Sequence, residues 1–465
     1  MDFIKLITSY FNILKSINMS SKYIEIVPTN VPSNGKISFK NGHPVIQFLM
    51  GATEHLLLGS SIRLTGEMKC FQKSTGLGGG ANLEPTPPTA ADKLTMDGTN
   101  GIYSTIDQLV IKNVGQFSTI EHIKNYNRMM ASYMPITSSL DDTTGHFAET
   151  ALTQPNWALM KSSVVDNSGA PSAGNYQTNQ FSIHLPCGLF LGQQPIYLGE
   201  NGVNGIVIEI HLAPDSQVFF QQDGAQDTSG IQDAFYEFEN LKLTAELVQP
   251  DAATLSSLRG KSGNTYQYNS ISSYYTSINS AQSIVNFNLG LRNVLGVWCN
   301  FIEANRINNW RYNGMDTRWI HNSDDTPAAI TNLTFLKGGT KFPDNFDTQT
   351  LQKDNAKNDI VDPAVIRQFM NAITQFAKQG RTMVSPLNTF QNSNAIDTYI
   401  SEGREFAGIG MAYDQVSGQG IDFSKENWGL QMVSNLTTDN PTGVYLFVHS
   451  KQTLVFNKSG LQILK

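Results

Sequence analysis

FYEFENLKLTAELVQP, residues Phe235 to Pro250, is the stretch from which the fold of the chain can be predicted. From Leu241 to Leu247 apolar and polar residues alternate, which is the pattern of a strand with one buried face. Upstream, the apolar positions Tyr236 and Phe238 are out of phase with this alternation. The change of phase at Glu239 to Asn240 predicts a β-bulge, because one extra residue turns the following side chains to the opposite face.

The C-terminus also ends in predicted β-strands, as the first half does at Phe235 to Pro250. Val444 to His449 is predicted to be a strand, followed by a short polar connection at Ser450 to Gln452 and strands at Thr453 to Phe456 and Leu461 to Leu464. Because Pro250 ends the first ladder and divides the chain into halves of similar length, we expect a duplicated architecture. The duplication is inferred from the order of elements, since the two halves share no line-by-line sequence identity.

A chain of 465 residues is longer than one core usually holds, so two domains are expected. The predicted division is an N-terminal amphipathic arm at 1–21, a first domain at 22–250 and a second domain at 251–465. In the arm, Ile4, Ile7, Phe11 and Leu14 recur at helical spacing. Such a helix packs on its own domain or a neighbouring subunit, or it contacts a membrane or the interior of a particle.

Composition restricts the class of function. Charged residues make up 15% of the chain, the formal charge is −7, and no basic face suited to coating nucleic acid is expected on the folded body. Three widely spaced cysteines indicate neither a disulfide framework nor a zinc site. The sequence has no apolar run long enough for a membrane-spanning helix and no secretion signal, so we expect a protein made inside the cell.

One main helix is predicted in each half. In the first half, Ser118 and Glu121 form a capping box, and Ile120, Ile123, Tyr126, Met130 and Met134 supply an apolar side before Pro135. In the second half, Asp362 is the expected N-cap, Pro363 the first helical residue, and Gly380 the end. The buried face of this second helix is predicted to comprise Val365, Ile366, Phe369, Met370, Ile373 and Phe376.

The rest of the sequence predicts many short strands joined by long loops, without a regular alternation of strands and helices. Residues 72–101, which contain GLGGG and PTPPT, are expected to be an exposed insertion. This order predicts an all-β fold of two consecutive antiparallel jelly-roll sandwiches, each with one main helix and long loops.

Motifs for chemistry are absent or weak. Gly76 to Gly80 is followed by ANLEPTPP rather than by a helix, and Gly260 to Ser262 lacks the first glycine of a phosphate-binding loop. The eight histidines form no metal-ligand pair, and the adjacent carboxylates at 141–142 and 324–325 are typical of solvated loops. We therefore predict no catalytic, cofactor-binding or metal-binding residues, no cofactor, no small-molecule substrate and no enzymatic activity.

Two other classes of protein remain possible from the sequence. An enzyme on paired jelly rolls, such as an amidase or a copper oxygenase, would need convergent acids or His and Met ligands, whose spacing is not found. A carbohydrate- or receptor-binding protein, as a minor capsid or fibre component, would need a solvent-facing aromatic cluster. The nearest candidates for such a cluster are Tyr266, Tyr268, Tyr274 and Tyr275, although alternating tyrosines in a strand more often serve packing.

Residues 22–465 resemble the double jelly-roll major capsid proteins of DNA viruses, especially those of polinton-like viruses, virophages and related small viruses of protists. The resemblance rests on four pieces in order: NGVNGIVIEIHLAPDSQVFF (Asn201 to Phe220), FYEFENLKLTAELVQPD, LTFLKGGTKFP, and the end of the chain from Glu405 through NWGLQMVSN to YLFVHSKQTLVFNKSGLQILK.

The resemblance implies a major capsid protein that forms pseudo-hexagonal homotrimers in the shell of an icosahedral DNA virus. Expected partners are neighbouring trimers, penton and minor capsid proteins, and the genome or an inner membrane through residues 1–21. Residues 72–101 and 312–330 would be tower or intersubunit loops. The expected location is the virion, after assembly inside the host cell. A weakly charged surface without a catalytic constellation suits copies that meet one another.

Overall fold

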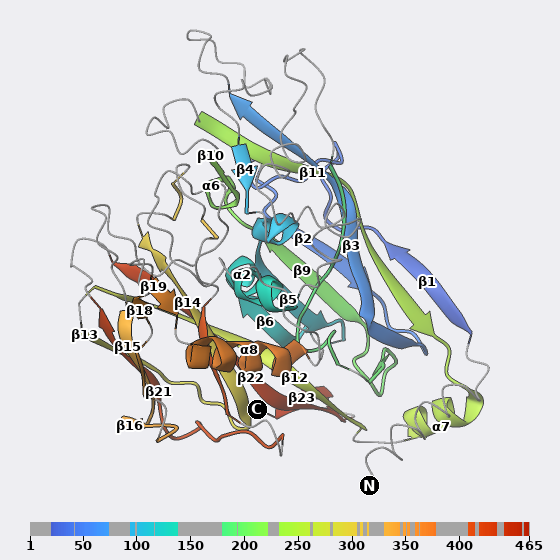
Figure 1. Ribbon diagram of the computed structural model, residues 1–465. Helices are drawn as coiled ribbons and strands as arrows, with labels where there is room; N and C mark the ends of the chain where they lie inside the picture. Colours follow the sequence, from blue (N-terminus) through green and yellow to red (C-terminus); the bar gives the residue numbers. More distant parts are fainter. Residues whose placement is uncertain are drawn as a thin grey trace.

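Figure 1 shows the computed structural model of the chain, with its helices as coiled ribbons and its strands as arrows. The described residues are 20–40, 42–73, 94–97, 100–115, 117–137, 179–192, 194–221, 232–260, 264–279, 282–304, 307–309, 314–315, 330–344, 347–349, 351–353, 359–361, 363–377, 408–413, 418–434, 441–457 and 460–464. Residues 1–19 lie outside this set, so the amphipathic arm remains a prediction.

The first half forms two antiparallel sheets. Its elements are β1 (Ser21–Ile26), β2 (Val45–Met50), β3 (Leu56–Lys73), β4 (Leu94–Met96), η2 (Gly101–Thr105), β5 (Ile106–Asn113), β6 (Thr119–Lys124), α2 (Tyr126–Thr137), β7 (Asn179–His184), β8 (Ile196–Tyr197), β9 (Ile206–Leu212), α6 (Asp215–Val218), β10 (Phe219–Gln221) and β11 (Gln232–Val248). One sheet has the order β1-β11-β3-β7, with β8 also pairing β3. The other has the order β2-β9-β5-β6, and β4 pairs with β10 apart from both.

The second half repeats this arrangement after the exposed helix α7 (Ala252–Gly260). Its further elements are β12 (Asn264–Ile278), β13 (Gln282–Phe287), β14 (Val294–Glu303), β15 (Ile330–Lys337), β16 (Thr340–Lys341), β17 (Asp347–Gln349), β18 (Leu351–Lys353), β19 (Asp359–Val361), α8 (Pro363–Ala377), β20 (Ile409–Ala412), β21 (Trp428–Ser434), β22 (Thr442–Asn457) and β23 (Gly460–Leu464). One sheet has the order β12-β22-β14-β20, with β23 pairing β22, and the other has the order β13-β21-β15-β16, with β17 pairing β15.

The strand orders of the two halves correspond element by element. In each half the first strand pairs with the last long strand, β1 with β11 and β12 with β22. In each half a helix, α2 or α8, precedes the strand at the far edge of that sheet, β7 or β20. The predicted fold class is therefore confirmed: the chain is all-β and consists of two consecutive antiparallel jelly rolls.

The predicted β-bulge in the closing strand is also confirmed. The pairing of β11 with β3 changes register between Glu239 and Lys242, and Asn240 between them has a φ of 54°. Leu241, Leu243, Ala245 and Leu247 then face the core. Asparagine is one of the few residues that occupy this left-handed conformation readily, which explains its position at the bulge.

The predicted start of the first helix is wrong. Residues 119–124 form the strand β6, paired with β5, and α2 begins only at Tyr126. Asn125, with a φ of 52°, separates the two elements, and its carbonyl accepts the first helical hydrogen bonds from Arg128 and Met129. The β-branched residues of β6 favour a strand, and Glu121 finds its hydrogen-bond partners outside its own segment.

The second helix begins at Pro363 as predicted, and Val365, Phe369, Ile373 and Phe376 are buried. Met370 is only half-buried. The side chain of Ile366, and Asp362 and Gly380 as predicted ends of the helix, lie outside the described residues.

The polar connection predicted at Ser450 to Gln452 is wrong, because β22 continues through it. Residues 450–452 pair with β12 opposite Ser270, Asn269 and Tyr268. Ser450 and Gln452 are buried, and the Gln452 side chain accepts a hydrogen bond from the Tyr268 hydroxyl at 3.3 Å. The polar residues thus belong to an interior strand and do not form a turn.

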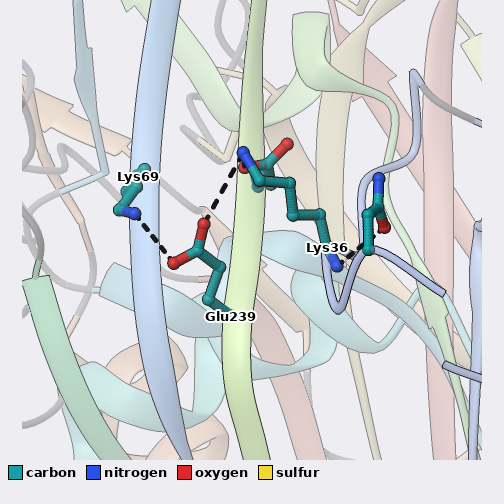
Figure 2. A network of polar contacts seen from close by, with 5 residues as sticks. Lys36, Lys69 and Glu239 are labelled. Carbon is teal, nitrogen blue, oxygen red and sulfur yellow. Dashed lines mark hydrogen bonds and ion pairs between the residues drawn. The ribbon is translucent and has the colours of Figure 1, made fainter. Parts of the chain in front are cut away.

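A charged network covers the outer face of β11 and β3 near the bulge (Figure 2). Glu239 lies between Lys69, at 2.8 Å, and Lys36, at 3.8 Å. Lys36 also contacts the buried Glu237 at 3.0 Å, and this hydrogen bond raises the pKa of the Lys36 ammonium. Ile37 exchanges backbone hydrogen bonds with Phe238, so the network holds the segment before β2 against the sheet.

Candidate functional site

The candidate functional site is the junction between the two jelly rolls. At its centre β6, an edge strand of the first half, lies against β12, an edge strand of the second. The two strands belong to different sheets and share no backbone ladder. Side chains therefore provide the polar contacts between these edges.

Glu121 of β6 provides the central contact. Its Oε1 accepts hydrogen bonds from the backbone N–H of Ile271 in β12, at 2.7 Å, and of Gly188, at 3.1 Å. Its Oε2 accepts one from the N–H of Leu189 at 3.0 Å. The carboxylate thus satisfies N–H groups of the turn after β7 and of the edge of β12, which would otherwise be buried without acceptors.

Burial controls the protonation of this site. Glu121 is 3% exposed, and loss of hydration raises the pKa of its carboxyl, opposed by the three backbone hydrogen bonds. The Cys187 thiol also hydrogen-bonds to Glu121, and burial together with the nearby carboxylate raises the pKa of this thiol well above its usual value. Cys187 is therefore a structural cysteine and lacks the low pKa of a nucleophile.

Close backbone contact explains the glycine at position 188. A Cβ at Gly188 would lie 1.9 Å from the carbonyl oxygen of Asn269 in β12. Nearby, the Tyr268 hydroxyl donates to the Ile120 carbonyl at 3.0 Å and Tyr266 donates to the Gln194 carbonyl at 3.0 Å. Both halves thus contribute backbone and side-chain atoms to one packed surface.

The helices form a second part of the junction. Figure 1 shows α2 and α8 next to each other there, and Tyr133 of α2 packs edge-on against Phe376 of α8 with ring centroids 6.1 Å apart. Asn300 of β14 donates to the Arg128 carbonyl at 2.8 Å. The Arg128 guanidinium lies over the Tyr445 ring, 5.4 Å from its centroid. An arginine in this position combines a cation–π contact with packing of its alkyl stem.

Smaller contacts between the two halves lie near α7 and near α6. Near α7, Asn264 donates to the Asn201 carbonyl at 3.1 Å, and Arg259 pairs with Glu54. Near α6, the Ser216 hydroxyl donates to Asn308 at 3.1 Å. The halves are therefore linked at several separate places, which favours a rigid block over two domains on a flexible linker.

Both faces of the sheet β12-β22-β14-β20 are buried, and the junction covers one of them. One face packs inside the second jelly roll, where the Trp428 indole donates to Tyr413 at 2.6 Å. The other face packs against α8, with Trp298 and Phe376 centroids 5.8 Å apart, and against α2. Burial on both faces explains why Val444 to His449 is a continuous apolar run without alternation.

Comparison with solved structures agrees with this architecture. PBCV-1 VP54, from a structure fitted into a reconstruction of the virophage Sputnik, matches 96% of this chain and 97% of its own, with a TM-score of 0.55 and 9% identity. The Sputnik virophage structure matches 96% of this chain and 88% of its own, with a TM-score of 0.52 and 13% identity. The Faustovirus major capsid protein matches 94% of this chain and 91% of its own, with a TM-score of 0.51 and 8% identity.

The chain has the double jelly-roll fold of these proteins. No protein-family model and no curated protein matches it in sequence. At such low identity the agreement concerns the path of the chain, and it includes both jelly rolls because nearly the whole length is matched.

The predicted tyrosine cluster does not form a solvent-facing platform. Tyr266 and Tyr268 are buried at the junction, and Tyr274 is half-buried with its hydroxyl bonded to the Leu289 carbonyl at 2.9 Å. Tyr275 is 55% exposed and its ring packs at a tilt against Tyr445, with centroids 4.9 Å apart. The four residues thus serve different contacts.

Within the described residues no group of three or more His, Cys, Asp or Glu side chains could hold a metal ion. In the same part of the chain no helix has the length and apolar character needed to cross a membrane. Residues 76–80, 141–142, 261–262 and 324–325 lie outside the described residues.

Sequence reasoning missed Glu121 as a junction residue. The pattern Ser118-x-x-Glu121 satisfies the rule for a capping box, and this local rule assigned the carboxylate to the wrong partner. The signal that favours the correct assignment is a single carboxylate among β-branched and apolar residues, followed by Asn125, which ends the strand. Its partners at 188, 189 and 271 are too distant in sequence to be inferred from one chain.

Proposed function

We propose that this protein is the major capsid protein of an icosahedral DNA virus and that it forms pseudo-hexagonal homotrimers in the virion shell. The observation that carries the proposal is the joining of two jelly rolls of the same strand order into one block by the Glu121 junction. The similar solved structures include a viral major capsid protein and components of a virus capsid and a virophage. A fixed angle between two equivalent units is what a shell-forming block requires.

The division into an arm at 1–21, a first jelly roll at 22–250 and a second at 251–465 is part of the proposal. It is supported by the sheets, because each described sheet pairs strands from one side of residue 250 only. Helix α7, which follows the boundary, has no buried residues and connects the halves at the surface.

The proposed partners are other copies of this chain, then neighbouring trimers, penton and minor capsid proteins, with the genome or an inner membrane reached through residues 1–21. The proposed role includes no catalysis and no small-molecule substrate. A low content of charged residues supports this role, since copies of one chain must approach each other closely without strong repulsion. Each contact between copies can be modest, because the stability of a shell comes from the contacts that every copy makes with all of its neighbours.

The first test is the mass of the purified chain, measured by light scattering during size exclusion. The proposal expects a stable species of three times the 51.2 kDa chain mass, and electron microscopy of concentrated trimer should show hexagonal arrays. A monomer whose mass does not change with concentration would overturn the proposal.

A further inference from the structure

The outer face of the sheet β2-β9-β5-β6 carries a group of titratable side chains (Figure 1). Leu109 of β5 and Ile123 of β6 are buried in the core of the first jelly roll. Because successive residues of a strand point to opposite faces, the side chains of Gln108, His122 and Lys124 point outward. Lys124 is exposed and His122 is half-buried, so both can meet a ligand on this face.

Three basic side chains surround Gln108. Lys124 of β6 and the half-buried His211 of β9 lie on either side of it, in register across β5. Residues paired in this way have Cβ atoms about 5 Å apart. The Nε2–H of His122 donates to Gln108 Oε1 at 2.9 Å. Within the described residues, none of these three basic groups forms an ion pair with a carboxylate.

The hydrogen bonds of Gln108 define the tautomer of His122. Gln108 donates through its Nε2 to Asp107 at 3.1 Å, so its Oε1 is left as the acceptor for His122. The neutral ring therefore carries its hydrogen on Nε2. Nδ1 becomes a donor only when the ring takes up a proton, and His122 can then bind an added acceptor without losing Gln108.

Positive charge around His122 opposes this protonation in the free chain. Burial lowers the pKa of the His122 ring, and so do the positive charges near it. These charges belong to Lys124, His211 and Lys112, and the carboxylate of Glu209 acts in the opposite direction. An anion bound among these groups would relieve their repulsion and raise the pKa of His122, so binding of the anion and of the proton favour each other.

The same face already holds one carboxylate. Glu209 of β9 accepts hydrogen bonds from Lys112 Nζ at 2.7 Å and from Gln47 Nε2 at 3.1 Å. Charge-assisted hydrogen bonds of this kind are stronger than those between neutral groups. Lys124 and the protonated ring of His122 offer donors of the same kind to a carboxylate that comes from outside the chain.

The elements that pack against this group add little charge. β2 and β12 contain no charged residue and no histidine, and α2 contains only Arg128, which is buried in the junction. On the strands themselves, Lys112 and Lys124 are balanced by Asp107 and Glu209 while the histidines are neutral. Protonation of both histidines gives the face an excess of positive charge.

We propose that the outer face of β2-β9-β5-β6 around His122, His211 and Lys124 binds an acidic segment of another protein at mildly acidic pH and releases it near neutral pH. Carboxylates of the segment accept hydrogen bonds from the lysine and from the protonated rings. The net charge of −7 disfavours nucleic acid, whose many phosphates would meet repulsion beyond this small group. The inference goes beyond the proposed function and concerns a face of the single chain.

The test measures binding of a fluorescent peptide of alternating Asp and Ser to the full-length chain by anisotropy. Ionic strength is held constant, and the pH is about 5.5 or about 7.5, on either side of the ordinary pKa of histidine. The peptide stays ionised at both values, because the pKa of Asp is about 3.9. Binding should be about tenfold or more tighter at the lower pH, since each linked proton whose pKa rises by one unit changes the affinity up to about tenfold.

Substitutions separate the contributions of the three basic residues. His122→Gln combined with His211→Gln should bind the peptide with equal affinity at both pH values. Lys124→Gln should weaken binding at both and keep the preference for low pH. His184→Gln is the matched control and should behave as the wild type, because His184 is exposed on β7 of the other sheet. Circular dichroism and thermal midpoints at both pH values check that each variant is folded.

Three results would overturn this inference. PH dependence that survives in the double histidine variant would show that other groups take up the protons. Inorganic phosphate that binds as tightly as the peptide, or a matched Asn and Ser peptide that binds equally, would exclude recognition of an acidic segment. Absence of peptide binding at both pH values would do the same and leave the proposed function standing, because the mass of the assembled chain is measured separately.

Discussion

The Glu121 carboxylate accepts a hydrogen bond from the Ile271 N–H at 2.7 Å although the two residues lie 150 positions apart. Ile271 is on the edge strand β12, where a backbone ladder would ordinarily continue. A side chain takes the place of the missing strand, so the sheet ends there and a second jelly roll begins beside it. A single carboxylate therefore contributes both to closing one sheet edge and to joining two domains.

Replacing Glu121 with Gln is expected to lower the free energy of unfolding by about 2–4 kcal/mol, because an amide nitrogen would face a backbone N–H in a buried site. Equilibrium denaturation measures the change. Glu25→Gln is the control, since the Glu25 side chain is 64% exposed and pairs with Lys242 at 3.0 Å, so the loss of this pair should cost at most about 1 kcal/mol. Equal effects of the two substitutions would contradict the special role of Glu121.

Gly188→Ala is expected to destabilise the chain by about 3 kcal/mol or more, because the added methyl would lie 1.9 Å from the Asn269 carbonyl oxygen. In the Gly188→Ala variant, backbone hydrogen exchange should become faster than in the wild type along β12, and this acceleration should be larger in β12 than in β9. Gly51→Ala is the matched control, because no atom lies within 4 Å of its added Cβ and its backbone is not left-handed. If β12 stays as protected as in the wild type, the close contact at Gly188 is not needed.

Sequence patterns predicted the features that depend on alternation of apolar and polar residues within one strand. They failed for residues whose contact partners are distant in the sequence. The bulge at Glu239 and Asn240 was predictable because the phase of the apolar residues changes within the strand itself. The assignment of Glu121 to a helix cap failed because a cap and a buried interdomain contact use the same carboxylate chemistry.

The segment Ser450 to Gln452 is a second case in which a local sequence pattern predicted the wrong structure. Three polar residues in a row predict a turn when one assumes that strand interiors are apolar. Here the Gln452 side chain accepts a hydrogen bond from Tyr268 at the junction, so the polarity reflects an interior contact. The location of such a contact depends on how two domains pack, which a single sequence does not specify.

Stability should depend on pH through Asp215, next to the contact of α6 with Asn308. Burial raises the pKa of Asp215 from 3.8 to about 6. Between these values the folded state binds more protons than the unfolded state, so this group's contribution is complete below pH 4 and is lost as the pH rises through 6. The loss is at most about 3 kcal/mol, since one pKa unit corresponds to about 1.4 kcal/mol.

Asp215→Asn tests this dependence, because its stability minus that of the wild type should rise between pH 4 and pH 6. The Asn side-chain oxygen can still accept the Tyr236 N–H, which bonds to Asp215 at 3.0 Å. Asp422→Asn should give the opposite trend at lower pH, with its stability minus that of the wild type falling as the pH rises towards 4, because hydrogen bonds from Ser424 hold the pKa of Asp422 below 3.8. Parallel stability profiles for the wild type and Asp215→Asn would exclude the proposed linkage.

Cys187 and Cys299 should resist alkylation in the native protein. Both are buried, and burial raises the pKa of each thiol, so little thiolate is present near neutral pH and reagent cannot reach it. Peptide mass spectrometry after a timed iodoacetamide pulse gives the modified fraction at each site, with guanidinium-unfolded protein as the fully reactive control. In Glu121→Gln, labelling of Cys187 should accelerate while Cys299 stays protected, because only Cys187 contacts the altered carboxylate. Equal acceleration at both thiols would show global unfolding and not local opening of the junction.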